Sequence, residues 1–259
     1  MIDYTFSLVD FELLILILVR ISTFIYVAPF FSMRNVPARL KAGLSLAVTI
    51  LIFQSVDQSA VEYTGMIGYA VIVLREGITG LLIGFAANVC NSIILFAGNI
   101  IDMDIGLSMA QEFDMMMNTQ VTITGNLYQY FILLLLVATD MHHVLLRTLV
   151  DSFQVIPVNG QVFDWTSLAN SMIRFMSDLF IIAFRIMLPI FASIMILNCI
   201  LGIMAKVAPQ MNMFAVGMQM KVLLGLAVLL LTITLLPGIA DMIFKEMRTM
   251  MVSVMEGLY

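Results

Sequence analysis

The chain has 259 residues, of which 62% are hydrophobic and only 11% charged, with a mean hydropathy of +1.06 and a formal net charge of −5. Charged residues make up about a quarter of an ordinary soluble domain, so this composition excludes one and predicts an integral membrane protein in contact with lipid. The acidic balance leaves no basic surface for a phosphate backbone, which argues against nucleic acid as a partner.

Six apolar segments follow one another along the chain and are expected to be helices, which makes the predicted fold class an all-α membrane protein. They are Leu13 to Phe31, Leu40 to Phe53, Met66 to Ile101, Leu127 to Ala138, Ile173 to Val207 and Met218 to Ile243. A membrane-spanning helix needs about 20 residues, yet the third segment is much longer and the second falls short. Pro189 also removes a backbone donor inside the fifth segment. The helices are therefore expected to bend, form hairpins or protrude beyond the lipid.

Several features mark the ends of these segments. The first segment lacks the basic region and small-residue cleavage site of a signal peptide, so we expect it to be a retained transmembrane helix. Asp164 or Ser167 is the expected N-cap of the helix that leads into the fifth segment. Near the C-terminus, Met247, Met250 and Val254 share one face of an amphipathic helix, which is expected to lie on a membrane or a partner.

Four charged residues lie inside apolar segments: Arg20, Arg75, Glu76 and Arg185. An arginine at the centre of a membrane helix costs about 2.5 to 3.5 kcal/mol on insertion scales, so each charge needs a partner or water. Arg75 and Glu76 are adjacent and point to different sides of a helix, so they do not satisfy each other. Two interpretations stay open, namely snorkelling towards the interface and pairing with groups on other helices or subunits.

Small residues recur along the third segment at heptad spacing. The seam consists of Gly77, Gly80, Gly84, Ala87, Asn91 and Gly98. A helix face without bulk lets another backbone approach closely. The seam therefore predicts tight helix packing, either within the chain or against another subunit.

The stretch from Gly98 to Gln120 carries four acidic residues, five methionines and no basic residue. Methionine adapts to irregular surfaces that re-pack, and the stretch lies between apolar segments. A soft, negatively charged segment in that position indicates a gate rather than an enzyme site.

No recognised catalytic motif accompanies this pattern. His142 and His143 follow Asp140, but adjacent side chains on a helix point in different directions, so we expect a structural role for them. Cys90 and Cys199 are far apart and have no ligand-spaced neighbours. The chain is therefore predicted not to be an enzyme and to hold no cofactor or metal.

Five segments, in order and over nearly the whole chain, resemble the flagellar biosynthetic protein FliR family, the R/T-type subunits of the type III secretion export gate. They are APFFSMRNVPARLKAGLSLAVT (28–49), REGITGLLIGFAANVC (75–90), AGNIIDMDIGLSMAQEFD (97–114), TDMHHVLLRTLVDSFQVIP (139–157) and KVAPQMNMFAVGMQMKVLLG (206–225). The family often has a proline after the position of Asp114, where this chain continues with Met115.

The resemblance implies a subunit of the flagellar export gate, at the basal body in the bacterial inner membrane. There, kinked helical hairpins assemble with P-type and Q-type subunits into a helical, ring-like channel for unfolded flagellar proteins. Other flagellar export membrane proteins are further implied partners. Residues 1–157 would correspond to a P-like part and 158–259 to a Q-like helical hairpin.

In the family, the connection that corresponds to Gly106 to Gln120 projects into the channel as a plug. The residues that this likeness predicts to face the pore are Met109, Phe113, Asp114, Met115, Met116 and Met117. The carboxylate of Asp102 and its acidic neighbours would repel small anions or hold loop contacts. The alternatives are an injectisome export-gate homologue, a stand-alone secondary transporter that uses the intramembrane charges, and a structural scaffold that lines no pore.

Overall fold

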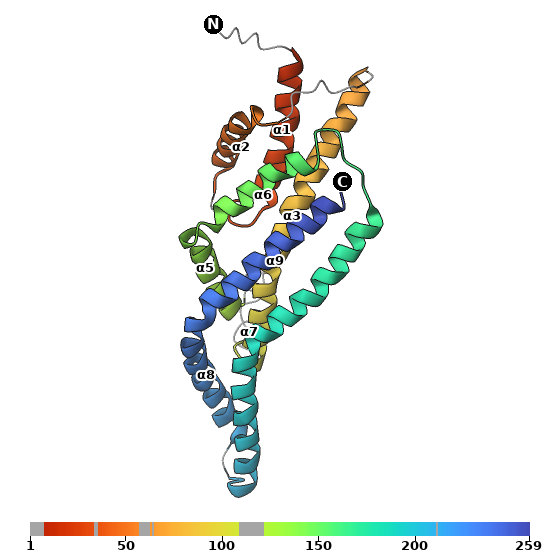
Figure 1. Cartoon of the computed structure of the whole chain (residues 1–259). Helices are drawn as coiled ribbons and strands as arrows, with labels where there is room; N and C mark the ends of the chain where they lie inside the picture. The colour runs from red at the N-terminus through yellow and green to blue at the C-terminus, as the bar shows by residue number, and fades with distance from the viewer. Residues whose placement is uncertain (1–7, 34–35, 57–62, 64, 109–121, 211) are drawn as a thin grey trace. The chain divides into compact units, whose positions relative to one another are not determined.

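The computed structural model describes residues 8–33, 36–56, 63, 65–108, 122–210 and 212–259, and within these ranges its regular structure is helical (Figure 1). The elements are α1 (Leu8–Val27), α2 (Ala38–Phe53), α3 (Gly65–Ile105), α5 (Ile123–Ala138), α6 (Met141–Val155), α7 (Trp165–Val207), α8 (Met213–Thr232), the short 3₁₀ helix η2 (Ile233–Leu235) and α9 (Leu236–Glu256). The predicted all-α membrane fold is confirmed.

Among the described residues, three stretches of helix are long and apolar enough to cross a membrane: Gly65–Ile105, Trp165–Val207 and Phe214–Glu256. The pair α5 and α6, separated by a break, raises the number to four if the pair counts as one span. With 41 residues, α3 measures roughly 60 Å along its axis, about twice the hydrocarbon thickness of a bilayer. The mismatch in length that the sequence predicts is therefore present in the helices themselves.

The described chain forms two compact units that alternate along the sequence. Unit 1 comprises Met1–Cys90, Asp140–Phe175 and Lys245–Tyr259, and unit 2 comprises Asn91–Thr139 and Met176–Phe244. Helices α3, α7 and α9 each contribute residues to both units. The P-like and Q-like parts suggested by the family likeness are continuous ranges of sequence, unlike these units. Those parts stay a prediction.

In unit 1, the start of α7 is capped by Asp164, one of the two expected caps. Its carboxylate accepts hydrogen bonds from Ser167 Oγ at 2.6 Å and from the backbone N–H of Thr166 at 3.0 Å. These hydrogen bonds hold the pKa of the Asp164 carboxyl below its usual value, and the bond from the Ser167 side chain has the largest effect. The cap satisfies a backbone donor that a helix start would otherwise leave open.

The amphipathic helix predicted at the C-terminus is the last part of α9, but its apolar face packs within the chain. Met247, Met250 and Val254 are buried, and Ser253 Oγ lies 2.7 Å from Ser171 Oγ of α7. The backbone N–H of Asp164 donates a hydrogen bond to the carbonyl of Gly257, directly after α9, at 3.1 Å. The expectation that this face lies on a membrane or a partner is therefore corrected, because its side chains are buried within the chain.

Candidate functional site

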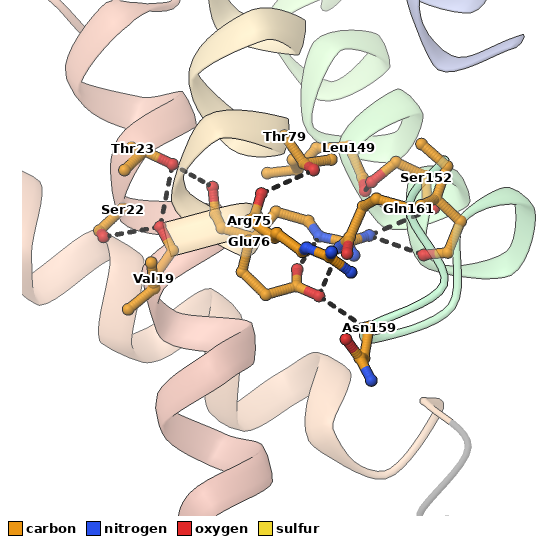
Figure 2. Close-up of polar contacts among 12 residues, drawn as sticks. Val19, Ser22, Thr23, Arg75, Glu76, Thr79, Leu149, Ser152, Asn159 and Gln161 are labelled. Carbon is orange, nitrogen blue, oxygen red and sulfur yellow. Dashed lines mark hydrogen bonds and ion pairs between the residues drawn. The ribbon is translucent and has the colours of Figure 1, made fainter. Parts of the chain in front are cut away.

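A buried ion pair joins the first and third helices in unit 1 (Figure 2). Arg20 of α1 and Glu76 of α3 approach to 2.6 Å between Nε and Oε2, and neither side chain has any exposed surface. Burial of two charges is unfavourable unless their remaining hydrogen-bonding atoms are also satisfied. The surroundings of the pair therefore decide whether it stabilises the fold.

The remaining partners of Arg20 come from the C-terminal end of α6. Its Nη1 donates to the backbone carbonyls of Ile156 at 2.9 Å and Ser152 at 3.4 Å, and its guanidinium carbon lies 4.3 Å from the centre of the Phe153 ring. Both carbonyls lie at the negative end of the helix dipole. The Ser152 carbonyl also accepts a hydrogen bond from the backbone N–H of Ile156 at 2.8 Å. Arg20 therefore caps α6 as well as pairing with Glu76.

The second carboxylate oxygen of Glu76 holds the turn that follows α6. Its Oε1 accepts a hydrogen bond from Gln161 Nε2 at 2.6 Å and another from the backbone N–H of Asn159 at 3.0 Å, and Figure 2 shows these groups converging on the carboxylate. Asn159 has a φ of 64°, a left-handed conformation that asparagine tolerates better than most residues. The pair thus ties together α1, α3 and the turn that precedes α7.

The other two predicted intramembrane charges lie on the surface of the described structure. Arg75 is exposed next to the buried Glu76, as expected for adjacent residues on a helix. Arg185 is also exposed, and its Nη1 lies 3.6 Å from Met242 Sδ in unit 2. Of the four charges, the structure brings together only Arg20 and Glu76.

The first half of the small-residue seam faces α1. A Cβ atom on Gly80 would collide with the carbonyl group of Arg20, and one on Gly84 would lie 3.0 Å from the carbonyl oxygen of Phe24. At Gly77 the same atom would find ordinary contact distances. Close approach of the two backbones in unit 1 therefore depends on glycine at two positions, and this contact lies within the chain.

The remaining seam residues divide between the two units. Ala87 is fully buried in unit 1, and Asn91, at the start of unit 2, is half-buried. In unit 2, a Cβ atom on Gly98 would collide with the backbone of Gly125 in α5. Glycine at position 98 thus lets α3 and α5 touch backbone to backbone. A Cβ atom on Gly125 would instead collide with the Thr122 side chain and lie at an ordinary 3.5 Å from the Cα atom of Leu95.

Close to this glycine contact, a buried hydrogen-bond cluster joins the two ends of the connection between α3 and α5. The backbone N–H of Thr124 donates to Asp102 Oδ1 and Oδ2 at 3.2 and 3.3 Å, and its hydroxyl donates to Oδ1. Both residues are only 1% exposed. Since Thr124 is the second residue of α5, its N–H has no acceptor within the helix, and the carboxylate from α3 supplies one. We call this arrangement the loop base.

The Asp102 carboxylate is buried and binds the start of α5, while the two roles considered for it stay a prediction. The predicted pore-facing residues all lie outside the described residues. They are Met109, Phe113, Asp114, Met115, Met116 and Met117.

Sequence reasoning missed the partners of these groups. Residues 158–164 look like ordinary turn residues, yet Asn159 and Gln161 bind Glu76. Nothing in the sequence marks the carbonyls of Ser152 and Ile156 as partners of a distant arginine. A signal did exist at Thr124, where polar residues and a glycine precede an apolar segment, a pattern typical of a helix start.

Long apolar helices, a buried ion pair and glycine-mediated helix contacts define an all-α integral membrane protein. The family model for "Bacterial export proteins, family 1" matches residues 11–247. The chain belongs to this family.

Three curated relatives are each named flagellar biosynthetic protein FliR. The chain is 28% identical to the protein of Bacillus subtilis (strain 168) over 243 residues, which covers 92% of this chain and 93% of the relative. It is 24% identical to that of Escherichia coli (strain K12) over 241 residues, covering 93% and 92%, and 24% identical to that of Aquifex aeolicus (strain VF5) over 217 residues, covering 84% and 83%. The resemblance to the FliR family is confirmed.

Proposed function

We propose that this chain is a subunit of the flagellar type III protein export gate. It forms part of the channel through which unfolded flagellar proteins cross the bacterial inner membrane at the basal body. Family membership and relatives named FliR support the export role, and the apolar helices support the membrane location. The connection from Gly106 to Gln120 acts as the plug of that channel.

The observation that carries the proposal is the loop base. Asp102 and Thr124 enclose most of the acidic, Met-rich stretch, and their buried hydrogen bonds hold its two ends at one place in unit 2. The close backbone contact between Gly98 and Gly125 holds α3 and α5 together near the loop base. A functional loop works best when a rigid scaffold fixes its ends, and a plug needs such a base in order to return to one position.

The chemistry of the stretch suits a seal that has to yield. Unbranched methionine side chains adapt to irregular partners, so Met115, Met116 and Met117 close the lumen at rest and mould around a passing polypeptide. The seal matters energetically, because moving one elementary charge across 100 mV corresponds to about 2.3 kcal/mol, and an open pore would dissipate that difference.

A transporter mechanism would instead need the intramembrane charges to meet a small substrate. Arg20 and Glu76 bind each other without any exposed surface, and their remaining contacts are to α6 and the following turn. The geometry therefore favours a structural role for Arg20 and Glu76, which supports the channel proposal over a transporter that would use this pair.

The gate subunit assembles with P-type and Q-type subunits and with other flagellar export membrane proteins, and residues 158–259 serve as its Q-like hairpin. Within unit 1, Val162 N–H donates to the carbonyl of Leu258 at 3.0 Å, which ties the end of the chain to the residues before α7. Within unit 2, a Cβ on Gly217 of α8 would lie 3.3 Å from the Leu201 side chain of α7. These contacts support a hairpin, and residues 1–157 make the P-like part.

Large apolar side chains exposed along α7 and α8 support assembly with lipid and protein partners. Examples are Phe184 and Leu188 on α7 and Leu223 and Leu230 on α8, each more than half exposed. Exposed apolar surface on this scale marks contact with lipid or with another protein. The hairpin therefore offers the surface that neighbouring gate subunits would cover.

The plug is tested by replacing Met115, Met116 and Met117 together with alanine and measuring resting ion leak and export of flagellar proteins. We expect the leak to rise because the side chains that fill the lumen are removed. Met66→Ala, at a methionine that is 90% exposed at the start of α3, is the matched control and should leave the leak unchanged. A triple variant as tight to ions as this control would overturn the plug.

The partners are tested by purification in mild detergent followed by mass spectrometry. A gate subunit should come out with P-type and Q-type subunits in a fixed ratio. A chain that runs alone or as a small homo-oligomer would contradict the gate.

A further inference from the structure

The chain contains only two histidines, and the structure brings them together with an aspartate in unit 1. The ring centres of His142 and His143 lie 4.1 Å apart with their planes at 88°. One potential ligand atom from each of Asp140, His142 and His143 lies within 4.8 Å of the others. The expectation that these side chains diverge is therefore wrong, and the cluster needs a different account.

The backbone at the start of α6 explains why the three side chains meet. Asp140 has φ 56° and ψ 18°, a left-handed conformation that aspartate tolerates better than most residues. Its carbonyl accepts a hydrogen bond from the backbone N–H of His143 at 3.0 Å. The tight turn brings the residue before α6 back over the first turn of the helix, where both imidazoles lie.

The surroundings of His142 leave one of its nitrogens without a partner. Nδ1 is buried and has no hydrogen bond among the described residues, while the Phe30 ring packs against the imidazole with its centre 6.0 Å away. Phe30 itself has φ 71°, an unusual conformation for a bulky residue, and such strain is concentrated at functional sites. A cation bound at Nδ1 would supply the partner that this nitrogen lacks.

We propose that Asp140, His142 and His143 bind one divalent transition-metal ion, of which Zn²⁺ suits the ligands best. Imidazole nitrogens and a carboxylate oxygen form zinc sites with bonds of about 2.0 to 2.2 Å, and water completes the tetrahedron when the protein supplies three ligands. Such bonds place ligand atoms about 3.3 Å apart, closer than the 4.8 Å limit of the cluster. Asp140 and His143 are exposed, so small rotations of these side chains close the difference.

The site would fix the first turn of α6. Arg20 already caps the other end of this helix through the carbonyls of Ser152 and Ile156. A metal ion at Asp140 and the two histidines would hold the opposite end, which has no side-chain cap. This inference does not depend on the export role of the chain.

The test is Zn²⁺ binding to the full-length chain in detergent, purified without a polyhistidine tag and followed by isothermal titration calorimetry. We expect one Zn²⁺ per chain, and His142→Ala and His143→Ala should each weaken binding by at least about tenfold. Cys199→Ser is the matched control, because this exposed cysteine is another possible zinc ligand, and the variant should bind as the parent does. Binding that survives when both histidines are replaced overturns the site, as does a parent chain with no saturable binding.

A second measurement needs no variant and so is independent of whether the variants fold. Cu²⁺ favours the same ligands, and pulsed electron paramagnetic resonance of the parent chain with one equivalent of Cu²⁺ should show two coordinated imidazoles. Because the chain holds only two histidines, the signal has a single possible source. A spectrum without imidazole coupling would refute the assignment.

Discussion

Replacement of Glu76 by glutamine should destabilise unit 1 more than any other change of one charge on α3. The carboxylate holds Arg20 at 2.6 Å and accepts hydrogen bonds from the turn after α6. Glutamine keeps the size of the side chain and one acceptor oxygen but removes the charge. The guanidinium of Arg20, which has no exposed surface, would then be buried without a counter-charge.

The magnitude follows from the burial of the pair. Removal of one partner from a buried ion pair costs about 3 to 5 kcal/mol, because the other charge stays in a low-dielectric surrounding. Arg20 keeps its two carbonyl acceptors and the Phe153 ring, so we expect the lower end, about 3 kcal/mol. Arg20→Met combined with Glu76→Met should cost less than the sum of the two single methionine variants, since no isolated charge is left behind.

The assay is unfolding of the purified chain in mixed detergent micelles, followed by circular dichroism, with the free energy of unfolding compared between variants. Arg75→Met is the matched control, because Arg75 is the exposed neighbour of Glu76 on the same helix, and it should change the free energy by less than about 0.5 kcal/mol. The reasoning would be refuted by a Glu76→Gln variant as stable as this control, or by methionine variants whose effects simply add.

Two further predictions concern glycine contacts and pH. Gly98→Ala should destabilise unit 2 by about 1 to 3 kcal/mol or more, because its Cβ would collide with backbone rather than with a side chain that can move. Gly43→Ala is the control, because Gly43 is in a helix and has nothing within 4 Å of the new atom; it should stabilise the chain by up to about 1 kcal/mol. Equal effects of the two variants in the same unfolding assay would contradict the predicted backbone collision at Gly98. Since the pKa of Asp164 is lowered in the folded state, its contribution is present above the unfolded pKa and is lost as pH falls through the folded one. Asp164→Asn should therefore flatten the acid side of a plot of melting temperature against pH, and an unchanged profile would count against the cap.

The existence of the helices could be predicted from the sequence because apolar runs of this length have few other stable forms in a membrane. The ends of the helices could be predicted less accurately, because some helices begin in polar residues outside the apolar runs. Helix α5 begins four residues before the apolar run, at Ile123, because the Asp102 carboxylate supplies an acceptor from another helix. The polar residues around Thr124 signal a helix start, but nothing in the local sequence identifies the distant Asp102 as its cap.

The buried charges show the same limit for the candidate site. The cost of charge in an apolar segment predicts that Arg20 and Glu76 need partners, and the structure supplies them. Their identities could not be predicted, because two acceptors of Arg20 are backbone carbonyls 132 and 136 residues away in sequence, and every residue type has one. Sequence pattern also could not separate Arg20 from Arg185, which lies in an equally apolar run but is exposed.

The most direct test of the channel proposal is site-specific photo-crosslinking to a substrate arrested in transit. A photoreactive residue in place of Met116 should crosslink to the arrested polypeptide, while the same residue in place of Met66, on the exposed start of α3, should not. Equal crosslinking at both positions, or none at Met116 while export is blocked, would contradict the channel role of this chain.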